Sequence, residues 1–185
     1  KEPIIMAEDV EVTTSSGIHA VAMSEFSLGM MLAFNYKIPH MLQLQRAVEW
    51  PKERQKIFAP QTLRGQTLGI VGYGAIGREL ARMADHLGMK VLAIKRDVMH
   101  PEDFDGYAEP GTGDQSGDIP TRIYPPEAIA SMASECDFLV LTVPLTVKTT
   151  HMVGEDVLKA MKKTAVLINV ARGPVVDEDA LISAR

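Results

Sequence analysis

Residues 68–77 read LGIVGYGAIG, and this stretch decides the fold of the 185-residue chain. The apolar run at 68–71 predicts a buried β-strand. Apolar side chains at steps of three and four from Ile76 to Leu87 predict a helix that follows it directly. A second apolar run at 89–94 predicts another strand, so the glycine pattern lies inside a strand–helix–strand unit of ordinary length.

The glycine pattern is G-x-G-x-x-G, and its context predicts a dinucleotide site. Gly72 permits a tight turn, Gly74 allows a diphosphate to approach the backbone, and Gly77 lets the helix pack closely on the strand. The N–H groups of the first helical turn then face the anion. The alternative is a glycine-rich turn that holds no ligand.

The end of the second strand is expected to select between NAD and NADP. NAD sites usually place Asp or Glu there, to accept a hydrogen bond from the ribose 2′-hydroxyl. Lys95 and Arg96 occupy this position, and two cations can pair with a 2′-phosphate. The sequence therefore predicts a preference for NADP(H). Alternatively, both are solvated charges and the site is indifferent; Asp97, one or two positions late, could also turn inward.

The rest of the chain alternates apolar strands with amphipathic helices. Acids and glycines dominate residues 97–120, which predicts a solvated, mobile loop, and residues 51–63 form a polar connector after Pro51. Further strands are predicted at 121–124, 138–141 and 165–170, and further helices at 20–36, 38–50, 126–133, 155–161 and 178–185. This alternation predicts an α/β fold, a Rossmann-type doubly wound parallel sheet with helices on both faces.

Two later strands end in residues suited to a ligand, because ligands lie beyond the carboxyl ends of such strands. Pro144 ends the hydrogen-bond ladder after the fourth strand, with Thr149 five residues on. Arg172 follows the last strand, where its guanidinium could bind a carboxylate in two places. The alternative is a surface arginine paired with Asp177 or Glu178.

Composition excludes several classes of protein. Apolar residues make up 46% and charged residues 23%, as in globular domains, and the net charge of −5 gives no footprint for nucleic acid or an anionic membrane. The segment 20–36 is short and polar for a membrane span. A single cysteine, Cys136, excludes an internal disulfide and fits the cytoplasm. The sequence has no His/Cys cluster at metal-ligand spacing, so no metal is expected.

Three segments together resemble one known family. They are VGYGAIG at 71–77, VPLT at 143–146 with Thr149, and INVARGPVVD at 168–177. They resemble the D-isomer-specific 2-hydroxyacid dehydrogenases, which implies reversible hydride transfer between NAD(P)H and C2 of a 2-oxo or 2-hydroxy acid. The resemblance also implies a homodimer, and the apolar helices before residue 50 fit burial against a second subunit; the alternative is burial against their own domain.

The resemblance further implies residue roles. It assigns the phosphates to Ala75 and Ile76, the ribose choice to Lys95, the adenine side to Val143, Pro144 and Thr149, and the nicotinamide side to Val170, Ala171 and Arg172. Arg172 matches the residue that binds the substrate carboxylate and carbonyl.

The expected domains are a nucleotide-binding domain at 17–185 and, at 1–16, the tail of a substrate domain or the crossover from it. The family's catalytic histidine and its glutamate are expected after Arg185, since none of His19, His40, His86, His100 and His151 matches. Two alternatives stay open: an NAD(P)-sensing, corepressor-like binding protein of the same fold, and a formate-type dehydrogenase.

Overall fold

Residues 13–59 and 61–184 are described by the structure, which is a computed structural model of the chain. The strands are β1 (Thr67–Val71), β2 (Lys90–Ile94), β3 (Arg122–Tyr124), β4 (Phe138–Leu141) and β5 (Val166–Asn169). The helices are α1 (Ala20–Asn35), α2 (Ile38–Ala47), α3 (Arg54–Ile57), α4 (Ala75–His86), α5 (Ile129–Glu135), α6 (Glu155–Ala160) and α7 (Glu178–Ser183). Two 3₁₀ turns, η2 (Pro126–Ala128) and η3 (Gly173–Val175), precede α5 and α7. Most of the segment 1–16, which we expect to be the tail of a substrate domain, lies outside the described residues.

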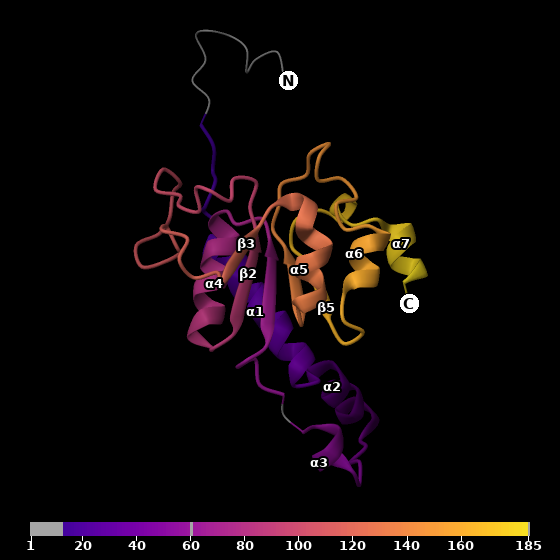
Figure 1. Cartoon of the computed structure of the whole chain (residues 1–185). Coiled ribbons are helices and arrows are strands. Elements are labelled where there is room, and N and C mark those ends of the chain that lie inside the picture. The colour runs from indigo at the N-terminus through magenta and orange to yellow at the C-terminus, as the bar shows by residue number, and fades with distance from the viewer. Residues whose placement is uncertain (1–12, 60, 185) are drawn as a thin grey trace.

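The five strands form one parallel sheet in the order β3-β2-β1-β4-β5. Because all strands run in the same direction, their carboxyl ends meet at a single edge, the upper edge in Figure 1. Chain order reverses at β1, which pairs with β2 on one side and β4 on the other. Ligands of open α/β sheets bind at such a reversal, so the topology places the candidate site beyond the end of β1.

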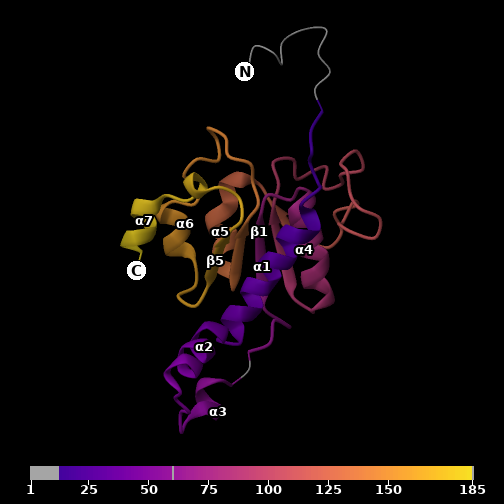
Figure 2. The same ribbon diagram turned by 180° about the vertical axis from the view of Figure 1, so that it is seen from behind.

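Helices cover both faces of the sheet, which confirms the predicted Rossmann-type architecture. On one face, Met31 of α1 and Leu80 of α4 pack on Ile70 and Val140. On the other face, Met132 of α5 packs among strand residues that alternate with those of the first face. Figure 1 shows α5 and α6 in front of the sheet, and Figure 2 shows α1 and α4 from behind.

The boundaries differ from the predictions at two places before β1. The second helix ends at Ala47 rather than at Trp50, because Val48 adopts a left-handed conformation with φ 55° and stops the helix before Pro51. The predicted connector at 51–63 contains one short helix, α3.

As predicted, the 97–120 loop contains no helix or strand, but part of it is buried. Asp114 has only 7% of its surface exposed, and Gly117 is also buried. The prediction of a solvated loop is therefore wrong for this part, because Gly113 and Asp114 are hydrogen-bonded to Glu79 and Arg78 in the first turns of α4.

Candidate functional site

The glycine turn lies between the ends of β2 and β4. Gly72 has φ +108°, a value that only glycine adopts readily, and an added Cβ would lie 2.8 Å from Cγ1 of Val143. The N–H groups of Gly72 and Tyr73 both donate to the carbonyl of Ile94, at 3.2 and 3.1 Å. The Oγ1 of Thr142 donates to the Gly72 carbonyl at 2.7 Å. These contacts fix the turn at the point where chain order reverses.

Gly74 and Gly77 differ in their surroundings. Gly74 precedes α4 in an extended conformation, and an added Cβ would meet no other heavy atom of the described chain within 4 Å. At Gly77, an added Cβ would lie 2.4 Å from the Gly72 carbonyl oxygen and 2.9 Å from Cγ2 of Ile70. The backbone is therefore open to a ligand at Gly74 and packed against the strand at Gly77.

The 12-residue helix α4 directs its N-terminus at this open position. Its first N–H groups have no partner within the helix, and its dipole favours an anion there. A buried serine supports the same turn from α1, since Ser24 Oγ donates to the Ile76 carbonyl at 3.0 Å. Ala75 and Ile76, predicted to contact phosphates, thus belong to a fixed first turn.

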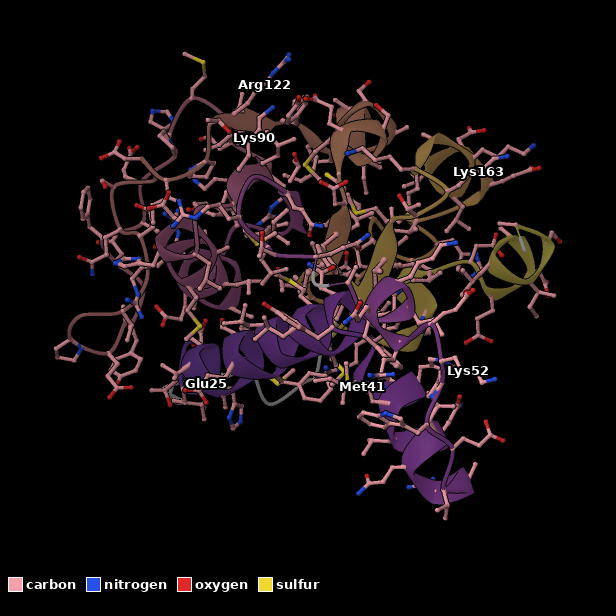
Figure 3. The ribbon with its side chains drawn as sticks, turned by 90° about the horizontal axis from the view of Figure 1, so that it is seen from below. Glu25, Met41, Lys52, Lys90, Arg122 and Lys163 are labelled. Carbon is pink, nitrogen blue, oxygen red and sulfur yellow. The ribbon has the colours of Figure 1, made fainter. Side chains whose placement is uncertain are left out.

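A cleft of about 900 Å³ opens beside the glycine turn, within the usual range of about 300–1,000 Å³ for small-molecule sites. Of the predicted site residues it is lined by Gly72, Gly74, Lys95, Arg96, Val143, Pro144 and Thr149. Ala75 lines a smaller adjoining cavity of about 120 Å³. Ile76, Gly77 and residues 170–172 do not line the described cleft. Figure 3 views the opposite edge, where Lys90 and Arg122 begin β2 and β3.

Charged residues that sequence reasoning did not assign also line the cleft. Besides Lys95 and Arg96, the lining includes the cation Lys148. Carboxylates come from Asp97, Asp103 and Glu127. Lys148 lies between Thr146 and Thr149 of the predicted motif, and this position was the only feature of the sequence that could have indicated a role for it.

The chain that follows β2 forms a turn held by Asp97. Asp97 accepts from the N–H groups of Met99 and His100 at 3.1 and 3.3 Å, and its Oδ2 lies 2.8 Å from Nδ1 of His100. The hydrogen bond with His100 holds the pKa of Asp97 below its ordinary value and raises the pKa of His100. Lys95 donates to the His100 carbonyl, which is a neutral acceptor.

The loop after β4 is closed by threonines. Thr149 Oγ1 donates to the Pro144 carbonyl at 2.7 Å and accepts from the Thr146 N–H at 2.8 Å. This arrangement shapes the wall of the cleft at Val143 and Pro144, both of which line it.

The turn after β5 is shaped by Asn169, which sequence reasoning left without a role. Its Oδ1 accepts from the Ala171 N–H at 3.0 Å, and its Nδ2 donates to the Arg172 carbonyl at 2.9 Å. Arg172 is exposed, and its Nη1 donates to the Ala171 carbonyl at 2.7 Å. Within the described chain no salt bridge joins Arg172 to Asp177 or Glu178, so the alternative of a paired surface arginine is not observed.

Other predicted features fall outside the cleft. Cys136 is buried between α5 and β4, and burial raises the pKa of its thiol to about 12. Among residues 13–59 and 61–184, no three His, Cys, Asp or Glu side chains gather as metal ligands. In the same ranges no helix has the length and apolar character needed to cross a membrane.

Comparisons with known proteins agree with this geometry. The NAD-binding domain model of the D-isomer specific 2-hydroxyacid dehydrogenases matches residues 28–185. A glyoxylate reductase from Thermococcus litoralis is 37% identical over 179 residues, which cover 95% of this chain and 49% of that protein. The chain thus spans about half the length of the curated relatives it matches.

Solved structures give the same result. Phosphoglycerate dehydrogenase from Lactobacillus plantarum superposes with a TM-score of 0.72 at 32% identity, covering 92% of this chain and 49% of that one. The acyclic imino acid reductase Bsp5, solved with NADPH and D-Arg, superposes with a TM-score of 0.69 at 25% identity, covering 89% and 46%.

Proposed function

The chain belongs to the D-isomer specific 2-hydroxyacid dehydrogenase family and contains its NAD-binding domain; from this we propose that it is the dinucleotide-binding part of an oxidoreductase. The enzyme transfers a hydride between NAD(P)H and C2 of a 2-oxo or 2-hydroxy acid. We assign the nucleotide-binding domain to residues 17–185 and the preceding 16 residues to the substrate domain. The observation that carries the proposal is the open backbone at Gly74, beside the N-terminus of α4.

The residues present fit a dinucleotide. A diphosphate can approach Gly74 because no side chain fills that space, and the N–H groups of Ala75 and Ile76 belong to the helical turn that faces it. Val143, Pro144 and Thr149 would line the adenine side, and Val170 and Ala171 the nicotinamide side. When bound, the cofactor supplies the hydride, and the protein supplies orientation and charge.

Arg172 is the residue we assign to the substrate carboxylate. Its planar guanidinium can donate two parallel hydrogen bonds to a carboxylate, and none of its donors is held by a carboxylate of the described chain. Asn169 fixes the backbone on both sides of it and acts as a positioning residue. Replacing Arg172 with Lys keeps the charge but loses the fork, so we expect a higher KM for the 2-oxo acid.

Lys95 and Arg96 support a preference for NADP(H). Both line the cleft. Asp97, which follows them, also lines it, but its carboxylate is already bonded to His100 and two N–H groups. The imino acid reductase Bsp5, to which the chain is similar, was solved in complex with NADPH, which supports this proposal. Replacing Lys95 with Asp should lower the ratio of kcat/KM for NADPH to that for NADH, and an unchanged ratio would remove the assignment.

The main test is reduction of a 2-oxo acid by the full-length protein. With NADPH or NADH and glyoxylate, we expect the absorbance of reduced nicotinamide to fall with time, and hydroxypyruvate should serve as a second acceptor. Uptake of a dinucleotide by calorimetry without turnover of any 2-oxo acid would favour a dinucleotide-sensing binding protein. Lack of uptake would refute both functions.

We also propose that the protein is a homodimer that uses the α1–α2 region. Apolar side chains are exposed along these helices, among them Phe26, Phe34 and Leu42. Trp50 has 80% of its surface exposed, and Figure 3 shows α2, with Met41, extending beyond the sheet. Light scattering on the full-length protein should give twice the mass of one chain; a monomer would contradict the assignment.

A further inference from the structure

A buried polar cluster joins the 97–120 loop to the glycine turn. It consists of Tyr73, Arg78, Glu79 and Asp114, which have 3%, 3%, 1% and 7% of their surfaces exposed. Burying charged groups is costly unless they are paired and hydrogen-bonded, so these contacts have to be made together. Figure 1 shows the loop beside the upper end of α4.

Asp114 is the centre of this cluster. Its Oδ2 accepts the Tyr73 hydroxyl at 2.5 Å and the Ile119 N–H at 3.2 Å. Its Oδ1 accepts the N–H groups of Gly117 and Asp118 at 3.1 and 3.2 Å. The Asp114 carboxylate therefore binds the backbone at the end of the loop and also the side chain of Tyr73, the residue between Gly72 and Gly74.

Arg78 binds both ends of the same loop from the first turns of α4. Its Nη1 donates to the Asp114 carbonyl, and its Nη2 donates to the Pro101 carbonyl at 2.5 Å. Its Nε lies 3.8 Å from Oδ2 of Asp103, and its guanidinium carbon lies 4.7 Å from the centre of the Tyr73 ring. The loop, the ring and the helix thus form one packed unit.

Glu79 completes the attachment. It accepts the Gly113 N–H at 2.6 Å and is paired with Arg82 through two hydrogen bonds of 2.8 and 2.6 Å. Burial alone would raise the pKa of Glu79, but the hydrogen bonds from Arg82 and Gly113 hold it below its ordinary value. The residue is therefore charged at neutral pH and keeps the loop against α4.

Tyr73 connects the cluster to the glycine turn. Tyr73 stands between two glycines, which restrain the backbone least of all residues. A fixed side chain at this position limits the motion of the turn on both sides of it. Burial raises the pKa of Tyr73 far above its ordinary value, so the hydroxyl stays protonated and donates to Asp114.

We propose that Asp114 is a positioning residue for the dinucleotide site: by holding the Tyr73 hydroxyl it fixes the Gly72–Gly74 turn in the conformation that admits a diphosphate. The inference rests on the proposed binding of a dinucleotide. A turn that is already in its binding conformation pays less conformational entropy when the ligand arrives, so the gain appears as affinity.

The test compares three variants of the full-length protein. Asp114→Asn replaces one acceptor oxygen by a donor that faces N–H groups, Tyr73→Phe removes only the hydroxyl, and Asp105→Asn is a matched control at an exposed carboxylate of the same loop. ADP-ribose, which carries the diphosphate, is titrated by calorimetry at a temperature where circular dichroism shows every variant folded.

We expect Kd for ADP-ribose to rise about tenfold in Asp114→Asn and about threefold in Tyr73→Phe. Changes of this size correspond to the loss of one hydrogen bond that holds the turn in its binding conformation. Asp105→Asn should match the wild type. In turnover, KM for the cofactor should rise while kcat at saturating cofactor stays unchanged, a split that mere loss of stability would not give.

The outcomes are separable from those of the proposed function. If the wild type takes up no ADP-ribose, dinucleotide binding itself fails. If the wild type binds and Tyr73→Phe, which loses only the hydroxyl, binds equally well, the link from Asp114 through Tyr73 is overturned. Equal weakening in Asp105→Asn would also overturn it, because the effect would then come from loop charge.

Discussion

Replacing Gly74 by Ala should weaken dinucleotide binding and leave the fold intact. The backbone at this position is extended, with φ −100° and ψ −162°, which alanine adopts without strain. A gain of about 0.4–1 kcal/mol from a less flexible unfolded chain offsets a loss of similar size from a poorer helix cap. The free energy of unfolding should therefore stay within about 1 kcal/mol of the wild type. The new methyl group enters the cleft, so Kd should rise at least about tenfold, or about 1.4 kcal/mol.

Gly77→Ala is the matched variant in the same motif, and it should lower the stability of the fold. Its methyl group would lie 2.4 Å from a backbone oxygen, which cannot move aside as a side chain can. Overpacking costs about 1–3 kcal/mol, of which a better helix former returns about 1 kcal/mol. The upper end of that range, about 3 kcal/mol, applies because the contact is with a backbone atom. The net loss is then about 2 kcal/mol, which for a domain of this size lowers Tm by about 4–8 °C.

Thermal unfolding followed by circular dichroism and calorimetric titration with NADPH and NADH measure the two quantities separately. The reasoning is refuted if Gly74→Ala binds both cofactors like the wild type, because a diphosphate would then not approach that backbone. It is also refuted if Gly74→Ala loses as much stability as Gly77→Ala.

Three further predictions concern the surroundings of the cleft and the core. In Asp97→Asn, the pKa of His100 should fall toward its ordinary value in an NMR titration, since the Asp97 hydrogen bond raises it; an unmoved pKa would show that the pair does not form. Because burial raises the pKa of Cys136 to about 12, the thiol should react with a disulfide reagent only upon unfolding, and fast labelling of folded protein would contradict this. Gly69→Ala places a methyl group 2.4 Å from Cys136 Sγ and should cost about 1–3 kcal/mol; Cys136→Ala in that background should restore part of it, and no recovery would contradict the packing.

The sheet and the glycine turn could be predicted because their signals are local. Apolar runs of four or five residues marked the strands, and the helix after Gly77 showed a clear period of three and four. The cap at Asp177 is equally local: its side chain accepts from the Ala180 N–H at 3.1 Å, three residues on. These features depend on neighbours in the chain, which the sequence displays directly.

The cluster around Asp114 could not be predicted, because its partners lie far apart in the chain. Asp114 is one of six acids between residues 102 and 118, and nothing in the sequence separates it from the five that stay near solvent. Its partner Tyr73 lies 41 residues earlier. The end of α2 was also hidden, because a β-branched valine in a left-handed conformation contradicts local preference.

The hydrogen bond from Thr142 to the Gly72 carbonyl spans 70 residues, and this separation has a consequence for biosynthesis. A ribosome adds about 5–20 residues per second, so the two walls of the cleft leave the exit tunnel about 4–14 seconds apart. During that interval the glycine turn is exposed without the strand that holds it. The dinucleotide cleft that we propose is therefore complete only after residue 142 has emerged.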